Sequence, residues 1–359
     1  MSVQSGGLGS ARRFAPAGVV FAALGLVLFG YFVWKAGPEK IWEQIATLGL
    51  GFLAVLLISA ARPAIRTLAW TRCFDSAHTL RFGAAIRAYL IGDSLGNLMP
   101  LGIVVSEPAK AALVRDRVPL AAAISALAVE NLFYMLSVAL FIFAGTAAML
   151  LSFPLPRQLR VAAFGTLGVV VLVLFVAFVA VRRKWRPLSR LLAFVGGISW
   201  GRRVVGGHGA RVGAIEDRVY GFYERHGARF LPILALEGCF HLAGVAEVFV
   251  TLHFMLDQPP EPLQLALAAF VLESVNRVIN VAFKFVPMRV GVDEAGSGMF
   301  TKVLGLGTTA GVTLAIVRKA RIVVWTGVGV ALLVRRGLSV RGAAEEALAA
   351  ARDAAAARL

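Results

Sequence analysis

The chain has 359 residues, of which 58% are hydrophobic and only 16% are charged, and its mean hydropathy is +0.78. Soluble domains carry about 25% charged residues, so the composition excludes an ordinary soluble domain and indicates an all-α polytopic integral membrane protein. The formal net charge of +17 is typical of basic loops on the cytoplasmic side of a membrane, and we expect no nucleic-acid partner. Cys73 and Cys239 have neither CxxC nor metal-ligand spacing, so we expect no redox chemistry and no cofactor.

Long apolar runs recur along the chain, each near the roughly 20 residues that a helix needs to cross a bilayer. The first run follows Arg12 and Arg13 without a small-residue cleavage site, which favours a retained span over a signal peptide. Together the runs predict about eight spanning helices, at 17–34, 47–70, 81–99, 119–151, 161–181, 231–256, 263–286 and 308–334. They divide the chain into a cytoplasmic N-terminus (1–16), a first membrane half (17–181), a basic cytoplasmic loop (182–229), a second membrane half (230–334) and a cytoplasmic tail (335–359).

Loop charge sets the expected orientation. The interval 182–229 holds eleven Arg and Lys against three acidic residues, whereas 257–262 holds two acidic residues and no base. Basic loops stay on the cytoplasmic side, so the first interval is expected inside and the second outside. The basic residues near both termini place both in the cytoplasm, as in a multi-pass protein of the bacterial inner (plasma) membrane. The basic loop is also expected to attract anionic lipids.

The stretch "NLMPLGIVVSEPAKAALVRDR" (97–117) lies between two apolar runs and contains two prolines and several charges. If it dipped into the membrane and returned, the spans that follow would leave the basic interval outside, against its charge. We therefore predict that it crosses, or at least inserts deeply, as a discontinuous helix. Backbone freed at Pro100 and Pro108 must face protein or a water-filled cavity, because it cannot face hydrocarbon.

A second stretch, "FVPMRVGVDEAGSGMF" (285–300), is similar to the first. When Pro287 is aligned with Pro100, Glu294 falls on Glu107, each seven residues after its proline. Breaks in the helices are expected at Pro100, Gly102, Pro287 and Gly291. The charge-based topology makes the two segments begin on opposite sides of the membrane, so the pattern predicts two inverted repeats, each with a discontinuous or re-entrant segment. Inverted repeats of this kind are a common architecture of transporters.

The motifs "NLMPLGIVVSEPAK", "AVEN", "VPMRVGVDEAG" and "LAIVRKAR" resemble the lysylphosphatidylglycerol synthase transmembrane, flippase-like family, over about 17–334. The resemblance implies a lipid-flipping membrane domain, and stand-alone members are associated with lipid, hopanoid or glycolipid pathways. Only 25 residues follow Val334, too few for the family's aminoacyltransferase domain, so synthase activity is not implied. Glu130 and Asn131 stand where an acid–arginine pair is expected.

Ionisable residues at membrane depth usually face a cavity and pair with one another. Glu107 and Glu294 are candidates for shaping such a cavity, and the arginines are candidates for binding a lipid phosphate, since a guanidinium offers several fixed donors. Within 263–286, Glu273 and its neighbours form a polar stripe. The candidate substrate-binding residues are Glu107, Lys110, Glu130, Asn131, Asn276, Arg277, Asn280, Arg289, Asp293, Glu294, Arg318 and Arg321.

Three alternatives for single residues stay open. Glu107, Glu130, Glu273 and Glu294 can instead be satisfied structurally by Arg62, Arg66, Arg277 and Arg318, with no ligand. Arg115, Arg117, Arg289 and Lys302 can be interface anchors. A run with Glu237, His241, Glu247 and His253 has no HExxH motif, which disfavours a metal site and leaves a proton-coupled role for His241.

Three functions follow from these residues. The first is a lipid or lipid-linked headgroup translocase that works by alternating access between the two halves, and not an enzyme. The second is a membrane-embedded transferase or hydrolase acting on a lipid headgroup, with Glu107, Glu294 or His241 in acid–base roles. The third is a non-transporting accessory subunit of a hopanoid or glycolipid synthesis pathway, with biosynthetic enzymes as partners.

Overall fold

The computed structural model describes residues 38–99, 102–183, 213, 217, 220–222, 224–283 and 291–336. Within these ranges the regular structure is entirely helical, as expected from the composition. The predicted first span, most of the basic loop and the C-terminal tail lie outside the described residues, as do Pro100, Pro287 and Arg289.

Five helices in the described ranges are long and apolar enough to cross a membrane. They are α3 (Leu50–Arg72), α6 (Leu120–Ser152), α7 (Arg157–Arg182), α11 (Phe230–Met255), which follows the short 3-10 helix η1 (Gly227–Arg229), and α12 (Pro262–Ala282). Helix α14 (Thr308–Arg335) has 28 residues, enough for about 42 Å of rise, although it carries Arg318, Lys319 and Arg321 near its middle. The protein is an all-α polytopic membrane protein.

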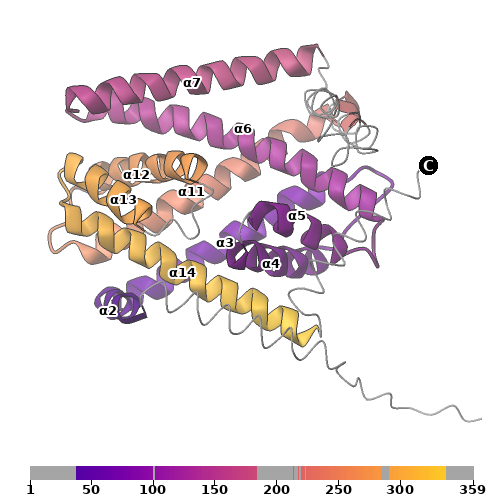
Figure 1. Cartoon of the computed structure of the whole chain (residues 1–359), viewed down its shortest axis with the longest axis horizontal. Coiled ribbons are helices and arrows are strands. Elements are labelled where there is room, and N and C mark those ends of the chain that lie inside the picture. The colour runs from indigo at the N-terminus through magenta and orange to yellow at the C-terminus, as the bar shows by residue number, and fades with distance from the viewer. Residues whose placement is uncertain are drawn as a thin grey trace, which may run out of the picture.

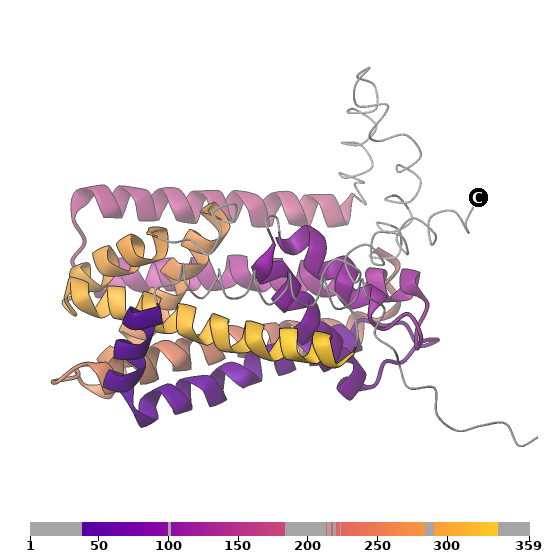
Figure 2. The same cartoon turned by 60° about the horizontal axis from the view of Figure 1, so that its bottom comes forward.

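Helix α7 lies on the outside of the bundle, beside α6 (Figures 1 and 2). Large apolar side chains on most of its length remain exposed, among them Phe164, Leu172, Phe175 and Phe178 at about 60%. A helix that is apolar all round is stable in hydrocarbon and not in water, so this surface faces lipid.

Helices α4 (Phe82–Leu98) and α5 (Gly102–Ala112) form an antiparallel pair in the half of the bundle drawn to the right in Figure 1. The pair is tight, since a Cβ on Gly102 would lie 2.0 Å from the carbonyl oxygen of Gly96. Ala84 and Arg87, near the start of α4, line one pocket with Leu113 and Arg117, which follow α5. The chain therefore enters and returns to the same end.

Of the two forms predicted for 97–117, a crossing or a deeply inserted discontinuous segment, the length of α5 fits the inserted one. The 11 residues of α5 rise about 16 Å, roughly half of a hydrocarbon core of about 30 Å.

Helices α12 and α13 (Val292–Val303) form a second pair, which lies toward the other end of the bundle (Figure 1). Helix α13 begins after Gly291, whose φ of 84° is a left-handed conformation that glycine adopts at no steric cost. It runs back toward the start of α14, where Gly298 contacts Thr308. Leu265 at the start of α12, Leu304 after α13 and Leu314 in α14 share one apolar cluster.

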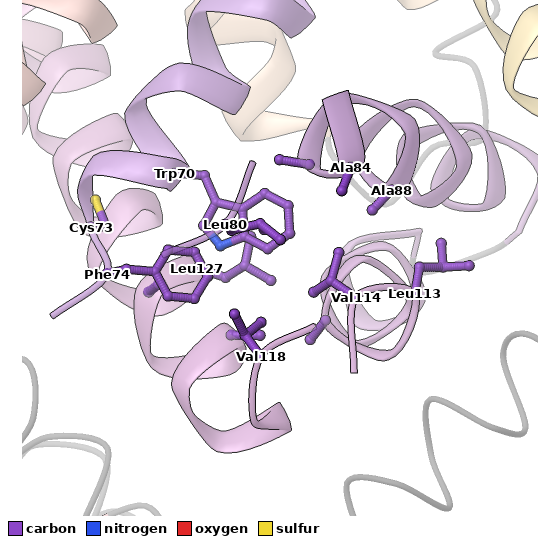
Figure 3. Packing of buried hydrophobic residues seen from close by; sticks show 14 of the residues in the cluster. Trp70, Cys73, Phe74, Leu80, Ala84, Ala88, Leu113, Val114, Val118 and Leu127 are labelled. Carbon is purple, nitrogen blue, oxygen red and sulfur yellow. The ribbon is translucent and has the colours of Figure 1, made fainter. Parts of the chain in front are cut away.

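Apolar packing fixes the α4–α5 pair against the rest of the bundle. Figure 3 shows Trp70 of α3 and Phe74, just after α3, packed with Leu127 of α6 and with Val114 and Val118, which follow α5. Alanines on α4 and α5 that are fully buried let the helices approach closely. At the opposite end, α2 (Pro38–Leu48) packs its Leu48 near Val317 of α14.

The two ends of the bundle differ in charge. We call the end where α3, α7 and α14 finish and α4 and α11 begin the basic end (Figure 1). It carries Arg72, Arg81, Arg87, Arg115, Arg117, Arg182, Arg229, Arg335 and Arg336. The opposite end has acidic Glu39, Glu43, Asp257 and Glu261 beside Arg157, Arg160 and Lys302. This asymmetry is the one that orients membrane proteins.

Candidate functional site

A cavity of about 240 Å³ lies inside the bundle, between α3, α4, α6, α11 and α14. We call it the central cavity. Its charged walls carry three arginines and one acid, and its other walls are largely aromatic or small and polar. The residues that line it are Ser59, Arg62, Pro63, Arg66, Tyr89, Leu90, Asp93, Ser94, Asn97, Tyr134, Phe240, Arg321, Ile322 and Trp325.

Helix α3 contributes two of the three arginines, Arg62 and Arg66, which lie four residues apart and therefore share a helix face. The Arg62 guanidinium lies 4.5 Å from the centroid of the Phe240 ring, and that of Arg66 lies 4.0 Å from the centroid of Tyr134. Aromatic faces attract cations, and more strongly away from water. The rings therefore hold both guanidinium groups at the wall of the cavity.

Helix α14 contributes the third arginine, Arg321. Its Nη1 donates to Glu247 of α11 at 3.2 Å, and Arg62 Nη1 donates to the same carboxylate at 3.3 Å. Two arginines thus share one acid, which leaves one positive charge in excess at this wall. The neighbouring Trp325 Nε1 donates to Ser59 Oγ at 2.7 Å, which ties α14 to α3.

A chain of polar contacts runs from Arg66 away from the cavity to the α4–α5 pair. Arg66 Nε donates to Glu130 at 2.7 Å, and Arg66 Nη2 lies 3.4 Å from Asn131 Oδ1. Asn131 Nδ2 donates to Glu107 at 3.1 Å, and Lys110 Nζ donates to the other oxygen of Glu107 at 2.9 Å. Helices α3, α6 and α5 are therefore joined by charge-assisted hydrogen bonds.

A second polar network joins α12, α13 and α14. Glu273 is 2% exposed and accepts from Arg277 at 2.5 Å, from Arg318 at 3.0 Å and from Asn276 at 3.3 Å. Arg318 also reaches Ser297 Oγ of α13 at 3.5 Å. The burial of these ions is tolerated because the Glu273 carboxylate is paired with two arginines.

Glu294 lies beside that network with partners of its own. It pairs with Lys319 of α14, and its other oxygen accepts from the Gly291 backbone N–H at 2.8 Å. This contact closes the first turn of α13, where a carboxylate also complements the helix dipole. Glu107 and Glu294 thus have separate partners, and neither is among the described residues that line the central cavity.

The sequence-predicted residues do not surround one cavity in the structure; they form separate groups of ion pairs and hydrogen bonds. Arg321 lines the central cavity, and Asp293 is buried in α13. Asn280 Oδ1 is buried without a hydrogen bond among the described residues. The pairs Glu130–Arg66, Glu273–Arg277 and Glu273–Arg318 are those of the structural alternative.

Sequence reasoning missed most of the cavity wall, namely Tyr89, Asp93, Asn97, Tyr134 and Trp325, and it treated Arg62 and Arg66 only as partners for acids. The spacing of the two arginines carried a usable signal. Two cations four residues apart inside an apolar run present both charges to the same side, which requires a polar lining there.

His241 does not assemble a metal site with its neighbours. Its Nε2 lies 3.0 Å from Ser137 Oγ, and its ring stacks on Phe141 with the centroids 4.7 Å apart. Glu247, on the same helix, is engaged by arginines instead. Within the described ranges no group of three or more metal-ligating side chains occurs.

A larger pocket of about 480 Å³ opens at the basic end. Ile91, Leu113 and Leu332 form its apolar floor, and four arginines stand around it: Arg87, Arg117, Arg335 and Arg336. The arrangement combines an apolar base with a basic rim, as expected where a protein meets lipid headgroups.

The sequence model described as the lysylphosphatidylglycerol synthase TM region matches residues 17–336. The chain belongs to this family. The match spans both helix pairs and every wall of the central cavity, and the family is membrane-associated and flippase-like in general. No curated protein and no solved structure matches the chain.

Proposed function

We propose that the protein is a translocase that moves the phosphate-bearing headgroup of a membrane lipid between leaflets, with the central cavity as the headgroup site. The observation that carries the proposal is the placement of Arg62, Arg66 and Arg321 on one cavity within a membrane-spanning bundle. Charged groups at such depth are rare and are functional by default. Arg62 and Arg321 share the single carboxylate of Glu247, and this local excess of positive charge favours an anionic ligand.

Chemistry and size both support a headgroup rather than a whole lipid. A guanidinium offers planar, fixed donors that match phosphate oxygens. The volume of about 240 Å³ is below the roughly 300–1,000 Å³ of sites that enclose a drug-sized ligand. The acyl chains would therefore remain in the bilayer while the headgroup enters.

The arrangement of the helices supports alternating access between two inverted halves. Each half has a spanning helix, a helix packed against a short helix, and a long helix: α3, α4–α5 and α6, then α11, α12–α13 and α14. The pairs begin at opposite ends of the bundle (Figure 1). Each short helix also pairs an acid with the long helix, Glu107 with Asn131 and Glu294 with Lys319. Halves of this kind can rock about a site between them.

The orientation belongs to the same proposal. The basic end would face the cytoplasm, because Arg and Lys concentrate there, and the membrane would be the bacterial inner membrane. Anionic lipids would gather at this end and at the basic loop. The Arg-rimmed pocket beside Arg87 and Arg117 would lie at the level of the cytoplasmic headgroups.

Reconstitution tests the proposal. Purified protein in vesicles that contain a headgroup-labelled phosphatidylglycerol should speed the movement of label between leaflets, as measured by its accessibility to an impermeant quencher. Mass spectrometry of the extracted lipid should show no chemical change. A modified headgroup would instead support a transferase or hydrolase, and the absence of both movement and product, with a co-purifying lipid-synthesis enzyme, would support an accessory subunit.

A further inference from the structure

Glu237, on the second turn of α11, is a buried acid with no hydrogen-bond donor among the described residues. Its side chain is 0% exposed, and neither carboxyl oxygen has a donor among the described residues. The nearest cation is Arg66, whose Nε lies 3.9 Å from Glu237 Oε2, beyond hydrogen-bond distance. An ionised carboxylate in this position would lack both water and a donor.

Among the described residues, the surroundings of Glu237 supply one cation, Arg66, for two acids. Glu130 of α6, 1% exposed, lies within hydrogen-bonding reach of Glu237 and already accepts from Arg66 at 2.7 Å. Besides Arg66, the end of α3 places the Cys73 thiol near Glu237, and Arg229 of η1 donates to the Phe74 carbonyl at 2.8 Å.

The remaining charged groups near α11 face its later turns. Glu273 of α12 contacts Gly244, and Arg277 of α12 stands by Phe240 and His241. Arg318 of α14 is held by Glu273. These groups contact other residues, so none of them neutralises the charge of an ionised Glu237.

Other buried acids in the bundle show the contrast. Glu247 is held by Arg62 and Arg321, and Glu273 by Arg277 and Arg318. Two carboxylates that share one site and one cation cannot both ionise at low cost, because like charges repel strongly away from water. A single proton placed between the two carboxyls removes one charge and creates an O–H···O hydrogen bond for the oxygens that lack a donor.

We propose that Glu130 and Glu237 share one proton, and that this proton site is linked to anion binding in the central cavity through Arg66. Arg66 touches both, since it lines the cavity and bonds Glu130. A phosphate that engages Arg66 reduces the positive charge available to the two acids, which then bind a second proton more readily. The linkage is reciprocal, so proton uptake tightens anion binding. The link to the cavity rests on the proposed function, whereas the shared proton does not.

Infrared spectroscopy of the full-length protein in nanodiscs tests the shared proton. The wild type should show the carbonyl band of a protonated carboxyl that shifts in D₂O, and Glu237→Gln, a neutral isostere, should lose it. Glu107→Gln is the control, because Glu107 has Lys110 and Asn131 as donors, and it should keep the band. A wild-type protein without the band would overturn the proposal, as would a band that survives in both Glu237→Gln and Glu130→Gln.

Titration with short-chain phosphatidylglycerol, followed by the fluorescence of Trp325 at the cavity wall, tests the linkage. Affinity should rise as pH falls, by about 5- to 150-fold between the two protonation states, and Glu237→Gln should flatten this dependence. Inorganic phosphate in a parallel titration distinguishes a free anion from a lipid headgroup. A pH-independent affinity would overturn the linkage. Failure of the lipid to bind at any pH would overturn the proposed function and leave the infrared result standing.

Discussion

The pairing of Glu247 with two cavity arginines allows folding and transport to be separated by a series of variants. Arg62 and Arg321 each donate to Glu247, at 3.3 and 3.2 Å, and the acid is 5% exposed. In Arg62→Gln/Arg321→Gln the carboxylate loses both cations. Adding Glu247→Gln to that variant removes the stranded charge but does not restore the cationic wall of the cavity.

The magnitudes differ for stability and for binding. Breaking a buried ion pair by removing one side costs about 3–5 kcal/mol, so the double variant should lose about that much free energy of unfolding. The triple variant should recover most of it. Each charge-assisted hydrogen bond to a phosphate contributes about 1.5–3 kcal/mol, so loss of two should weaken headgroup binding by about 10²- to 10⁴-fold in both variants.

Unfolding by denaturant in mixed micelles measures the first quantity, and leaflet exchange of labelled phosphatidylglycerol measures the second. We expect the triple variant to be folded and stable but to move labelled phosphatidylglycerol between leaflets slowly. If the triple variant were stable and moved lipid at the wild-type rate, the central cavity would not be the headgroup site. If the double variant were as stable as the wild type, Glu247 would not depend on its arginines.

Three further predictions test packing, charge balance and orientation. Gly102→Ala should lower the free energy of unfolding by at least about 1–3 kcal/mol, because its Cβ would lie 2.0 Å from a backbone oxygen of α4, whereas Gly83→Ala meets nothing within 4 Å and should be nearly neutral. Glu273→Gln should lower the free energy of unfolding by about 3–5 kcal/mol, since two buried arginines lose their carboxylate. The exposed control Glu261→Gln should lower it by under about 0.5 kcal/mol, and similar losses in the two variants would contradict the buried network. The orientation can be tested in a chain from which the two native cysteines have been removed. Arg117→Cys should react with an impermeant thiol reagent only after the cells are opened, whereas Glu261→Cys should react in intact cells. The reverse pattern would show the opposite orientation.

Much of the fold was predictable because lipid imposes a length and a composition on each span. The apolar runs at 47–70, 119–151, 161–181, 231–256 and 263–286 correspond to the five candidate spans. The helix breaks expected at Gly102 and Gly291 also match the structure, since Gly102 begins α5 and Gly291 immediately precedes α13. The path of 97–117 could not be predicted from the sequence. The helix that precedes it, α4, has 17 residues, and a run of that length is compatible with either a full span or one arm of a re-entrant pair.

The site was harder to predict than the fold, because its contacts join residues that are distant in the chain. Arg62 and Glu247 are 185 positions apart, and Trp325 and Ser59 are 266 apart. Sequence reasoning named many of the buried acids and bases, although it missed Asp93, and it named Arg66, Arg277 and Arg318 as structural partners. It could not decide which of them would face an empty space, since that depends on how α3, α4 and α14 pack.

The distribution of buried charge explains why an anion site and a proton site would occur together. At one wall of the central cavity two arginines share Glu247, an excess of positive charge, and near Arg66 two acids share one arginine, an excess of negative charge. Moving an uncompensated ion through the bilayer interior costs at least several kcal/mol. An anionic headgroup at the first wall together with a proton at the second adds no net charge to the bundle. A phosphate and a proton would then enter the bundle together as a neutral pair, each drawn by one of the two charge imbalances.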